Sequence, residues 1–342
     1  MPKNVDSTVP KKTNKKLVSP RPNNLSKEFK FIDLFAGVGG MRLALEASGG
    51  TCVFSSEWDV HAQKTYEANF GELPMGDITK VKVGDIPEFD VLSAGFPCQP
   101  FSSFGKRAGF KHKTQGTLFF DVLRIIESKT PSAFVLENVK GLLNHDKGRT
   151  IKTILEALDE VGYEVRHTVL NASDFGVPQH RERVYIVGFR RETFGSEPIF
   201  NWPVGKKKNV GIGRFIETNV TGYSISKHLQ RVYIYKQDDG RPEIVSPETK
   251  TPAKTLVASY HKIQRLSGTF VKDGPTGLRL LTQSECKAIM GFPKDFQIPV
   301  SRTQMYRQMG NSVAVPVVSA VATEITKTFN SFGEINIRKK NS

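Results

Sequence analysis

The strongest constraint on the fold is a regular alternation of short apolar runs and longer amphipathic stretches between residues 29 and 189. Strands that alternate with helices favour a mostly parallel sheet covered by helices on both faces. The expected strands are 31–35, 52–55, 91–94, 133–136, 164–170 and 184–189, and the expected helices are 40–48, 60–70, 117–129 and 150–161.

The pattern changes after residue 190, where short β-type runs such as 233–235 and 255–257 are separated by Gly, Pro, Asn and Asp. Helical spacing resumes at 281–290 and 317–329. We therefore predict an α/β fold with a disordered basic tail (1–28), a Rossmann-like domain (29–189 plus 279–342) and a smaller, mostly β or irregular domain (190–278).

The net charge of +15 is concentrated in two parts of the chain, with +5 in residues 1–28 and +7 in residues 190–278. Either run alone is accounted for by a solvated surface, but both together favour a polyanionic partner such as nucleic acid. No apolar run approaches the roughly 20 residues of a membrane span, and the N-terminus lacks the apolar core of a signal peptide. We expect a cytoplasmic protein without a membrane partner.

Three cysteines, Cys52, Cys98 and Cys286, are far apart in the sequence and form no CxxC pair. This number and spacing support neither a disulfide framework nor a cysteine metal site, so no metal is expected.

A glycine-rich turn follows the first expected strand, with Gly37, Gly39 and Gly40 ahead of a helix. Its spacing differs from the GxGxxG that seats a pyrophosphate, which disfavours a nicotinamide dehydrogenase. Glu57 ends the next strand, where a carboxylate can accept from ribose hydroxyls. Trp58 is placed to stack on adenine or to pack in the core, and Asp77 to accept from the adenine amino group. A nucleoside pocket without phosphates suits S-adenosylmethionine better than NAD.

Cys98 lies just past a strand, between Pro97 and Pro100, at the edge where open α/β sheets build their sites. A lone cysteine is usually a small buried apolar residue, but a stiff loop is what a positioned nucleophile requires. The basic, glycine-spaced segment 104–116 has the composition of a lid over an anionic substrate, or of a solvated loop.

Glu137 ends another apolar strand, where low-dielectric surroundings can raise its pKa and make it a proton donor; an ion-paired or helix-capping Glu is the alternative. Arg181 and Arg183 are spaced by two at the start of a strand, so their side chains point the same way.

In these residues the chain resembles the cytosine-C5 DNA methyltransferases of bacterial restriction-modification systems. The matching segments, in family order, are 33–40, 57–58, 76–78, 95–102, 137–139, 179–183 and 310–313, over about three-quarters of the chain. One departure is Phe104, where some relatives have a serine. The resemblance implies a methyltransferase with a Rossmann-like S-adenosylmethionine domain and a target-recognition domain at 190–278.

The resemblance also implies roles for individual residues. Cys98 is the expected nucleophile at cytosine C6, Glu137 the residue that bonds cytosine N3, and Arg183, supported by Arg181, a partner of the base or of the active loop. The expected methyl-donor pocket comprises Phe35, Gly37, Gly39, Glu57, Trp58, Asp77, Ile78, Phe96, Leu118, Asn311 and Val313.

The expected substrate is double-stranded DNA with a flipped-out cytosine, bound by a monomer, with a restriction endonuclease only as functional counterpart. Two alternatives keep this fold. One is a transfer RNA cytosine methyltransferase, which a recognition segment of nearly 90 residues disfavours. The other is a DNA-binding protein without catalysis, which the intact Cys98 and Glu137 disfavour.

Overall fold

The computed structural model describes residues 28–97, 118–206, 210–237 and 239–340, and of 333–340 only the backbone. Its centre is a six-stranded sheet with the strand order β2-β1-β3-β4-β6-β5. The strands are β1 (Phe29–Leu34), β2 (Gly50–Ser56), β3 (Val91–Gly95), β4 (Ala133–Val139), β5 (Tyr163–Asn171) and β6 (Glu182–Arg190). Each expected strand of the first 190 residues is therefore present, which confirms the Rossmann-like α/β prediction.

The sheet is mostly parallel, as predicted, with one reversed strand. Strands β2, β1, β3 and β4 are parallel, whereas β6 is antiparallel to both of its neighbours, β4 and β5. The chain passes from β5 to β6 through a short 3-10 turn, Ala172–Phe175, and so compact a connection joins antiparallel strands.

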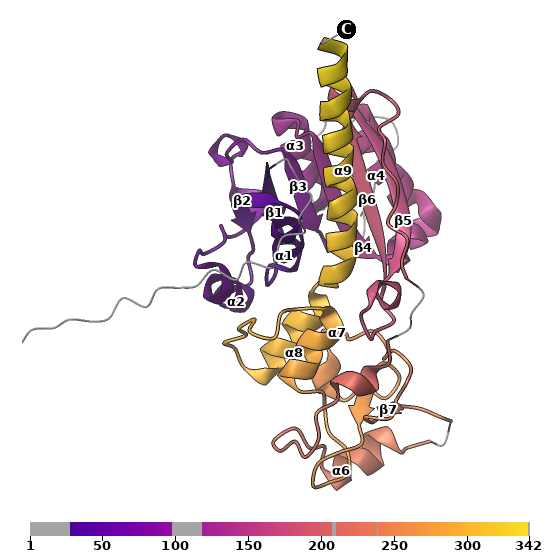
Figure 1. Ribbon diagram of the computed structural model, residues 1–342. Coiled ribbons are helices and arrows are strands. Elements are labelled where there is room, and N and C mark those ends of the chain that lie inside the picture. The colour runs from indigo at the N-terminus through magenta and orange to yellow at the C-terminus, as the bar shows by residue number, and fades with distance from the viewer. Residues whose placement is uncertain (1–27, 98–117, 207–209, 238, 341–342) are drawn as a thin grey trace, which may run out of the picture.

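Helices cover both faces of the sheet (Figure 1). In β4, Ala133 and Val135 pack into the core beneath α1 (Gly40–Ala47) and α9 (Val315–Lys340). Phe134 and Leu136 point to the other core, beneath α3 (Leu118–Lys129) and α4 (Arg149–Glu160). This alternation is the two-residue period of a strand that is buried on both sides. No helix among the described residues is both long and apolar enough to cross a membrane.

A second, smaller lobe lies below the sheet domain in Figure 1 and contains little regular structure. Its elements are α6 (Lys227–Leu229), a π-helical turn (Gln230–Ile234) and a parallel pair, β7 (Glu243–Val245) and β8 (Thr269–Val271). Helices α7 (Gln283–Met290) and α8 (Arg302–Asn311) lie between this lobe and the sheet domain. Helices α2 (Val60–Phe70) and α5 (Arg191–Phe194) complete the elements discussed below.

Two strand predictions in this lobe are wrong. Residues 233–235 fall at the end of the π-helical turn, because Gln230 and Ile234, one helical turn apart, are buried while Tyr233 and Tyr235 are exposed. Residues 255–257 form no strand, because the backbone of Leu256 is bound by the side chains of Gln179 and Arg181. In neither case does a neighbouring strand supply the hydrogen bonds that define a sheet.

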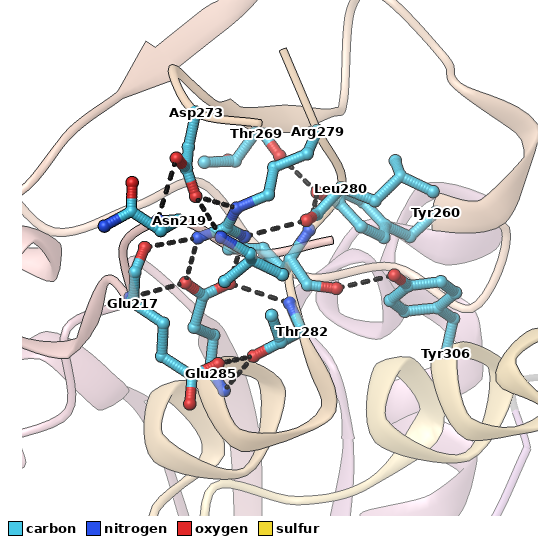
Figure 2. A network of polar contacts seen from close by, with 12 residues as sticks. Glu217, Asn219, Tyr260, Thr269, Asp273, Arg279, Leu280, Thr282, Glu285 and Tyr306 are labelled. Carbon is cyan, nitrogen blue, oxygen red and sulfur yellow. Dashed lines mark hydrogen bonds and ion pairs between the residues drawn. The ribbon is translucent and has the colours of Figure 1, made fainter. Parts of the chain in front are cut away.

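A buried ionic network ties the second lobe to α7 (Figure 2). The fully buried Arg279 donates to Asp273 Oδ2 at 2.8 Å and to both carboxylate oxygens of Glu285, at 2.7 and 2.8 Å. Glu285 also accepts from the backbone N–H groups of Glu217 and Thr282. The predicted limit between residues 278 and 279 thus falls inside a continuous set of contacts, and residues 279–285 pack with the second lobe.

Candidate active site

The glycine-rich turn leads from β1 into α1 with three residues in the left-handed region, Phe35, Gly37 and Gly39. A Cβ on Gly37 would meet nothing within 4 Å, so its backbone faces open space. A Cβ on Gly39 would lie 2.2 Å from the Phe70 ring. Gly37 therefore leaves room for a ligand, whereas Gly39 permits the close packing of α1 against α2.

This turn borders a cavity of 610 Å³ that extends over the carboxyl ends of the strands. Of the residues predicted for the site, all but Cys98 and Gly39 line it: Phe35, Gly37, Glu57, Trp58, Asp77, Ile78, Phe96, Leu118, Glu137, Arg181, Arg183, Asn311 and Val313. Gly39 does not line the cavity, and its place in the donor pocket stays a prediction. Cys98 and the segment 104–116 lie outside the described residues, although Pro97 lines the cavity.

One end of the cavity has the groups expected of a nucleoside site. The buried carboxylate of Glu57 accepts from the N–H groups of Gly37 and Asp59, both at 2.8 Å. Burial raises the pKa of this carboxyl group, although the two hydrogen bonds act to lower it. Trp58 is 76% exposed, which excludes the core-packing alternative for its ring. Asp77 caps a 3-10 turn, and its hydrogen bonds from Thr79 lower its pKa.

The other end of the cavity is built around Glu137, the third residue from the end of β4. Burial raises the pKa of its carboxyl group, while the guanidinium of Arg183, with Nε 3.2 Å from Oε1, acts to lower it. Glu137 pairs with Gly95 of β3, and a Cβ there would lie 3.6 Å from Oε2. Arg181 acts in the same direction as Arg183, but burial outweighs both, and a buried carboxyl that lines a cavity is suited to donate a proton to a ligand.

Asn138 connects this carboxyl to the segment that precedes Cys98. Its buried side-chain amide donates to the carbonyl oxygen of Phe96 at 2.8 Å, so the end of β4 holds the chain two residues before the cysteine. The sequence pattern pointed to Glu137 but gave no role to Asn138.

Comparison with known proteins shows to which family the chain belongs. The profile of the C-5 cytosine-specific DNA methylase family matches residues 29–327. The chain belongs to this family. It is 57% identical to the Type II methyltransferase M.MspI of Moraxella sp over 316 residues, which cover 92% of this chain and 75% of the relative. It is 46% identical to M.HpaII of Haemophilus parainfluenzae over 333 residues, 90% and 92% of the two chains. The protein is thus a DNA (cytosine-5-)-methyltransferase of the bacterial restriction-modification type.

Solved structures agree with this fold. A DNMT2 variant of Spodoptera frugiperda superimposes with a TM-score of 0.70 at 23% identity and covers 88% of this chain and 99% of its own. The Dnmt2 methyltransferase of S. pombe gives 0.69 at 20% identity, with 89% and 99% covered.

The two arginines of the methyltransferase's 179–183 segment differ in their surroundings. Arg183 is partly exposed and faces Glu137. Arg181 is buried and donates to three main-chain oxygens, of Leu256, Gly310 and Ser312. Burial, with repulsion from Arg183, lowers the pKa of Arg181 to about 9, which leaves it protonated near neutral pH. Both side chains line the cavity, as the spacing of two predicted, but Arg181 is already occupied by the protein's own carbonyl groups.

The two described cysteines of the methyltransferase are poor nucleophiles. Burial raises the pKa of Cys52 to about 12 and that of Cys286 well above its usual value. The thiolate is the reactive form of cysteine, and both environments disfavour it. Within the described residues, no cluster of His, Cys, Asp and Glu could hold a metal ion.

Sequence reasoning missed part of the cavity wall, namely Arg307 and Gln308 of α8. That helix was not predicted because only Met305, Tyr306 and Met309 mark its apolar side. A helix-start signal was present in Ser301, whose side chain accepts from the N–H of Gln304.

Proposed function

We propose that the enzyme transfers a methyl group from S-adenosylmethionine to C5 of a flipped-out cytosine in a short, specific duplex DNA site, through a covalent bond between Cys98 and cytosine C6. The observation that carries this proposal is the buried, pKa-raised Glu137, which shares one cavity with the nucleoside-type groups Glu57 and Trp58. In a restriction-modification system this reaction would protect host DNA from a partner endonuclease, with a monomer acting on each site.

The cavity fits the methyl donor. Gly37 leaves open space, the Glu57 carboxylate is held in place by two N–H groups, and the exposed Trp58 ring is free to stack. We assign Phe35, Gly37, Glu57, Trp58, Asp77, Ile78, Phe96, Leu118, Asn311 and Val313 to its binding. When bound, S-adenosylmethionine supplies an electrophilic methyl group on a sulfonium.

The chain's own residues activate the base. The Cys98 thiolate adds to C6, the π electron pair of the C5=C6 double bond shifts to C4–C5, and the C4=N3 π pair moves to N3, which leaves C5 as the nucleophilic carbon of an enamine. Negative charge develops towards N3, where protonated Glu137 donates, and such stabilisation of developing charge is typically a large catalytic contribution. Arg183 holds the Glu137 carboxyl and adds a positive charge beside the base. After methylation a base removes the C5 proton, the C5–H electron pair re-forms the C5=C6 double bond as the C6–S bond breaks, Cys98 departs as the thiolate, and the N3 proton returns to Glu137.

The substrate proposal follows from access and charge. C5 inside a duplex is out of reach, so the nucleotide is flipped into the cavity at a cost of a few kcal/mol. We propose residues 190–278, with +7 of the charge, as the target-recognition segment and residues 1–28, with +5, as an added contact to the phosphates.

One experiment tests this proposal. Random-sequence duplex DNA and transfer RNA are incubated with the enzyme and S-adenosylmethionine, and both are sequenced after bisulfite treatment. We expect 5-methylcytosine at one short DNA site and none in the RNA. Methylation confined to RNA would establish the RNA alternative, and no methylation of either would establish a binding protein without catalysis.

A further inference from the structure

Asp33 is a carboxyl group buried in the sheet just before the glycine-rich turn. It is the next-to-last residue of β1, pairs with Ser55 of β2 and Ser93 of β3, and has no exposed surface. Its side chain points to the same face of the sheet as Phe31, the face that α1 and α9 cover, since residues two apart in a strand point the same way. Phe35, two residues further on, lines the cavity, so the Cα atoms of Asp33 and Phe35 are at most about 7.6 Å apart.

The carboxyl group of Asp33 has few partners for so buried a group. Ser93 Oγ donates to its Oδ1 at 2.8 Å, whereas Oδ2 has no hydrogen-bond partner among the described residues. A buried carboxylate is normally paired with a cation or bound by several donors. Burial raises the pKa of Asp33 to about 7, although the hydrogen bond from Ser93 acts to lower it. Both the protonated and the ionised form are therefore populated near neutral pH.

The charged and titratable groups around Asp33 do not neutralise it. The cation that acts on it is Arg42 of α1, whose guanidinium already donates to three other side chains, those of Glu46, Tyr66 and Glu72. Cys52 of β2 and Tyr66 of α2 also face this carboxyl group, but burial raises the pKa of both and keeps them neutral. Glu57, which follows β2, acts to raise the pKa of Asp33. Among the described residues, ionised Asp33 thus has no cation of its own.

A cationic ligand in the cavity changes this balance. S-adenosylmethionine carries a positively charged sulfonium, whereas its product S-adenosylhomocysteine has a neutral thioether at the same place and shares its nucleoside and amino-acid groups. A positive charge about 10 Å from Asp33, acting through an effective dielectric constant of about 20, favours the ionised form of the carboxyl group roughly tenfold. The neutral product has no such effect.

We propose that Asp33 is a specificity-determining residue that loses its proton when the cationic methyl donor binds, so that a buried negative charge favours S-adenosylmethionine over S-adenosylhomocysteine. The proton passes to solvent as the donor binds. A proton returns to Asp33 once methyl transfer has converted the sulfonium into the thioether, so the cycle balances and product release is favoured. The proposal rests on the function proposed above, because it requires the methyl donor in this cavity.

The test measures the affinity of the full-length enzyme for each of the two ligands by calorimetry, without DNA, between about pH 6 and pH 8. Rising pH ionises Asp33, so the ratio of the affinity for S-adenosylmethionine to that for S-adenosylhomocysteine should rise about fivefold over this range. Titration of Glu57 affects both ligands through the ribose they share, and it cancels in the ratio. Asp33→Asn, which keeps the shape of the side chain, should hold the ratio constant within about twofold.

A matched control is Asp90→Asn, which removes a carboxyl group at the amino ends of β1 and β3, where Asp90 Oδ2 accepts from the Lys30 N–H. This variant should keep the wild-type pH dependence. Ser93→Ala removes the hydrogen bond that favours ionised Asp33, so the rise in the ratio should move to higher pH. This second variant carries the test if Asp33→Asn does not fold.

Three results would overturn the proposal: a ratio that is independent of pH in the wild type, a pH dependence that persists in folded Asp33→Asn, or a rise at unchanged pH in Ser93→Ala. Wild-type enzyme that binds neither ligand would instead refute the proposed cofactor.

Discussion

Replacing Arg279 by methionine should lower the free energy of unfolding by about 3 kcal/mol, the lower end of the range for breaking a buried ion pair. The side chains of Arg279 and Glu285 are fully buried, and that of Asp273 is 15% exposed. Without the guanidinium, the Glu285 carboxylate stays in the interior without a cation. Its remaining donors, the N–H groups of Glu217 and Thr282, soften the loss and place it at that lower end.

The assay is equilibrium unfolding in urea followed by circular dichroism. Adding Glu285→Gln to Arg279→Met should restore part of the stability, because the uncompensated charge is removed while glutamine still completes the capping box at Thr282. The control is Lys327→Met on α9, which breaks an exposed pair with Glu324 and should cost at most about 1 kcal/mol. A loss for Arg279→Met no larger than that of the control, or a double variant less stable than the single one, would refute the reasoning.

Three further predictions concern catalysis and DNA binding. Glu137→Gln should reduce kcat by about 10²- to 10³-fold and leave the free energy of unfolding unchanged, because the amide donates to N3 but transfers no proton. Single-turnover kinetics measure the rate of the chemical step. A rate within about twofold of wild type would exclude the assigned role. DNA affinity, measured by filter binding, should fall steeply between about 50 and 200 mM salt. Deletion of residues 1–28 should lower the affinity and make its dependence on salt less steep. The methylated site, read by bisulfite sequencing, should stay the same. Transplanting residues 190–278, extended to 285 to include the Arg279 network, into a relative should transfer the methylated site; an active hybrid that keeps the relative's own site would contradict the assignment.

The sheet domain was predictable from sequence because its strands are buried on both faces and its helices are amphipathic. In β4 the residues Phe134 and Val135 point to opposite cores, and a continuous apolar run is the signature of that burial. The reversed direction of β6 was not predicted, since strand order and direction depend on how the chain turns at Ala172–Phe175 rather than on the pattern of β6 itself.

The second lobe was predicted poorly because side chains, and not strand partners, satisfy much of its backbone. Leu256 lies in an apolar sequence run that is typical of a strand. Its backbone N–H and carbonyl groups instead form hydrogen bonds with the side chains of Gln179 and Arg181, more than 70 residues earlier in the chain. Such long-range side-chain contacts leave no local signal. The limit at residue 278 stays a prediction; just beyond it, Arg279 contacts Glu217, Asp273 and Glu285, and such long-range contacts are not visible in the local sequence pattern.

In the candidate site, the sequence motifs identified the functional side chains, while the structure showed how the surroundings of these residues differ. Arg181 and Arg183 look equivalent in sequence, yet only Arg183 faces Glu137. Gly39 looks like part of the cofactor turn, but its lack of a Cβ is required by the ring of Phe70.

The central claim is the covalent bond between Cys98 and cytosine C6, and 5-fluorocytosine at the target position tests it most directly. Thiolate addition and methyl transfer proceed on that base, but fluorine does not leave as a proton does, so the cysteine stays attached. We expect a denaturant-stable complex with DNA that requires S-adenosylmethionine and is lost in Cys98→Ser, since an alkoxide forms far less readily than a thiolate. Cys52→Ser and Cys286→Ala should still be trapped, because burial holds the pKa of both thiols above the usual range. Trapping that persists in Cys98→Ser, or peptide mapping that finds the DNA on another residue, would contradict the mechanism.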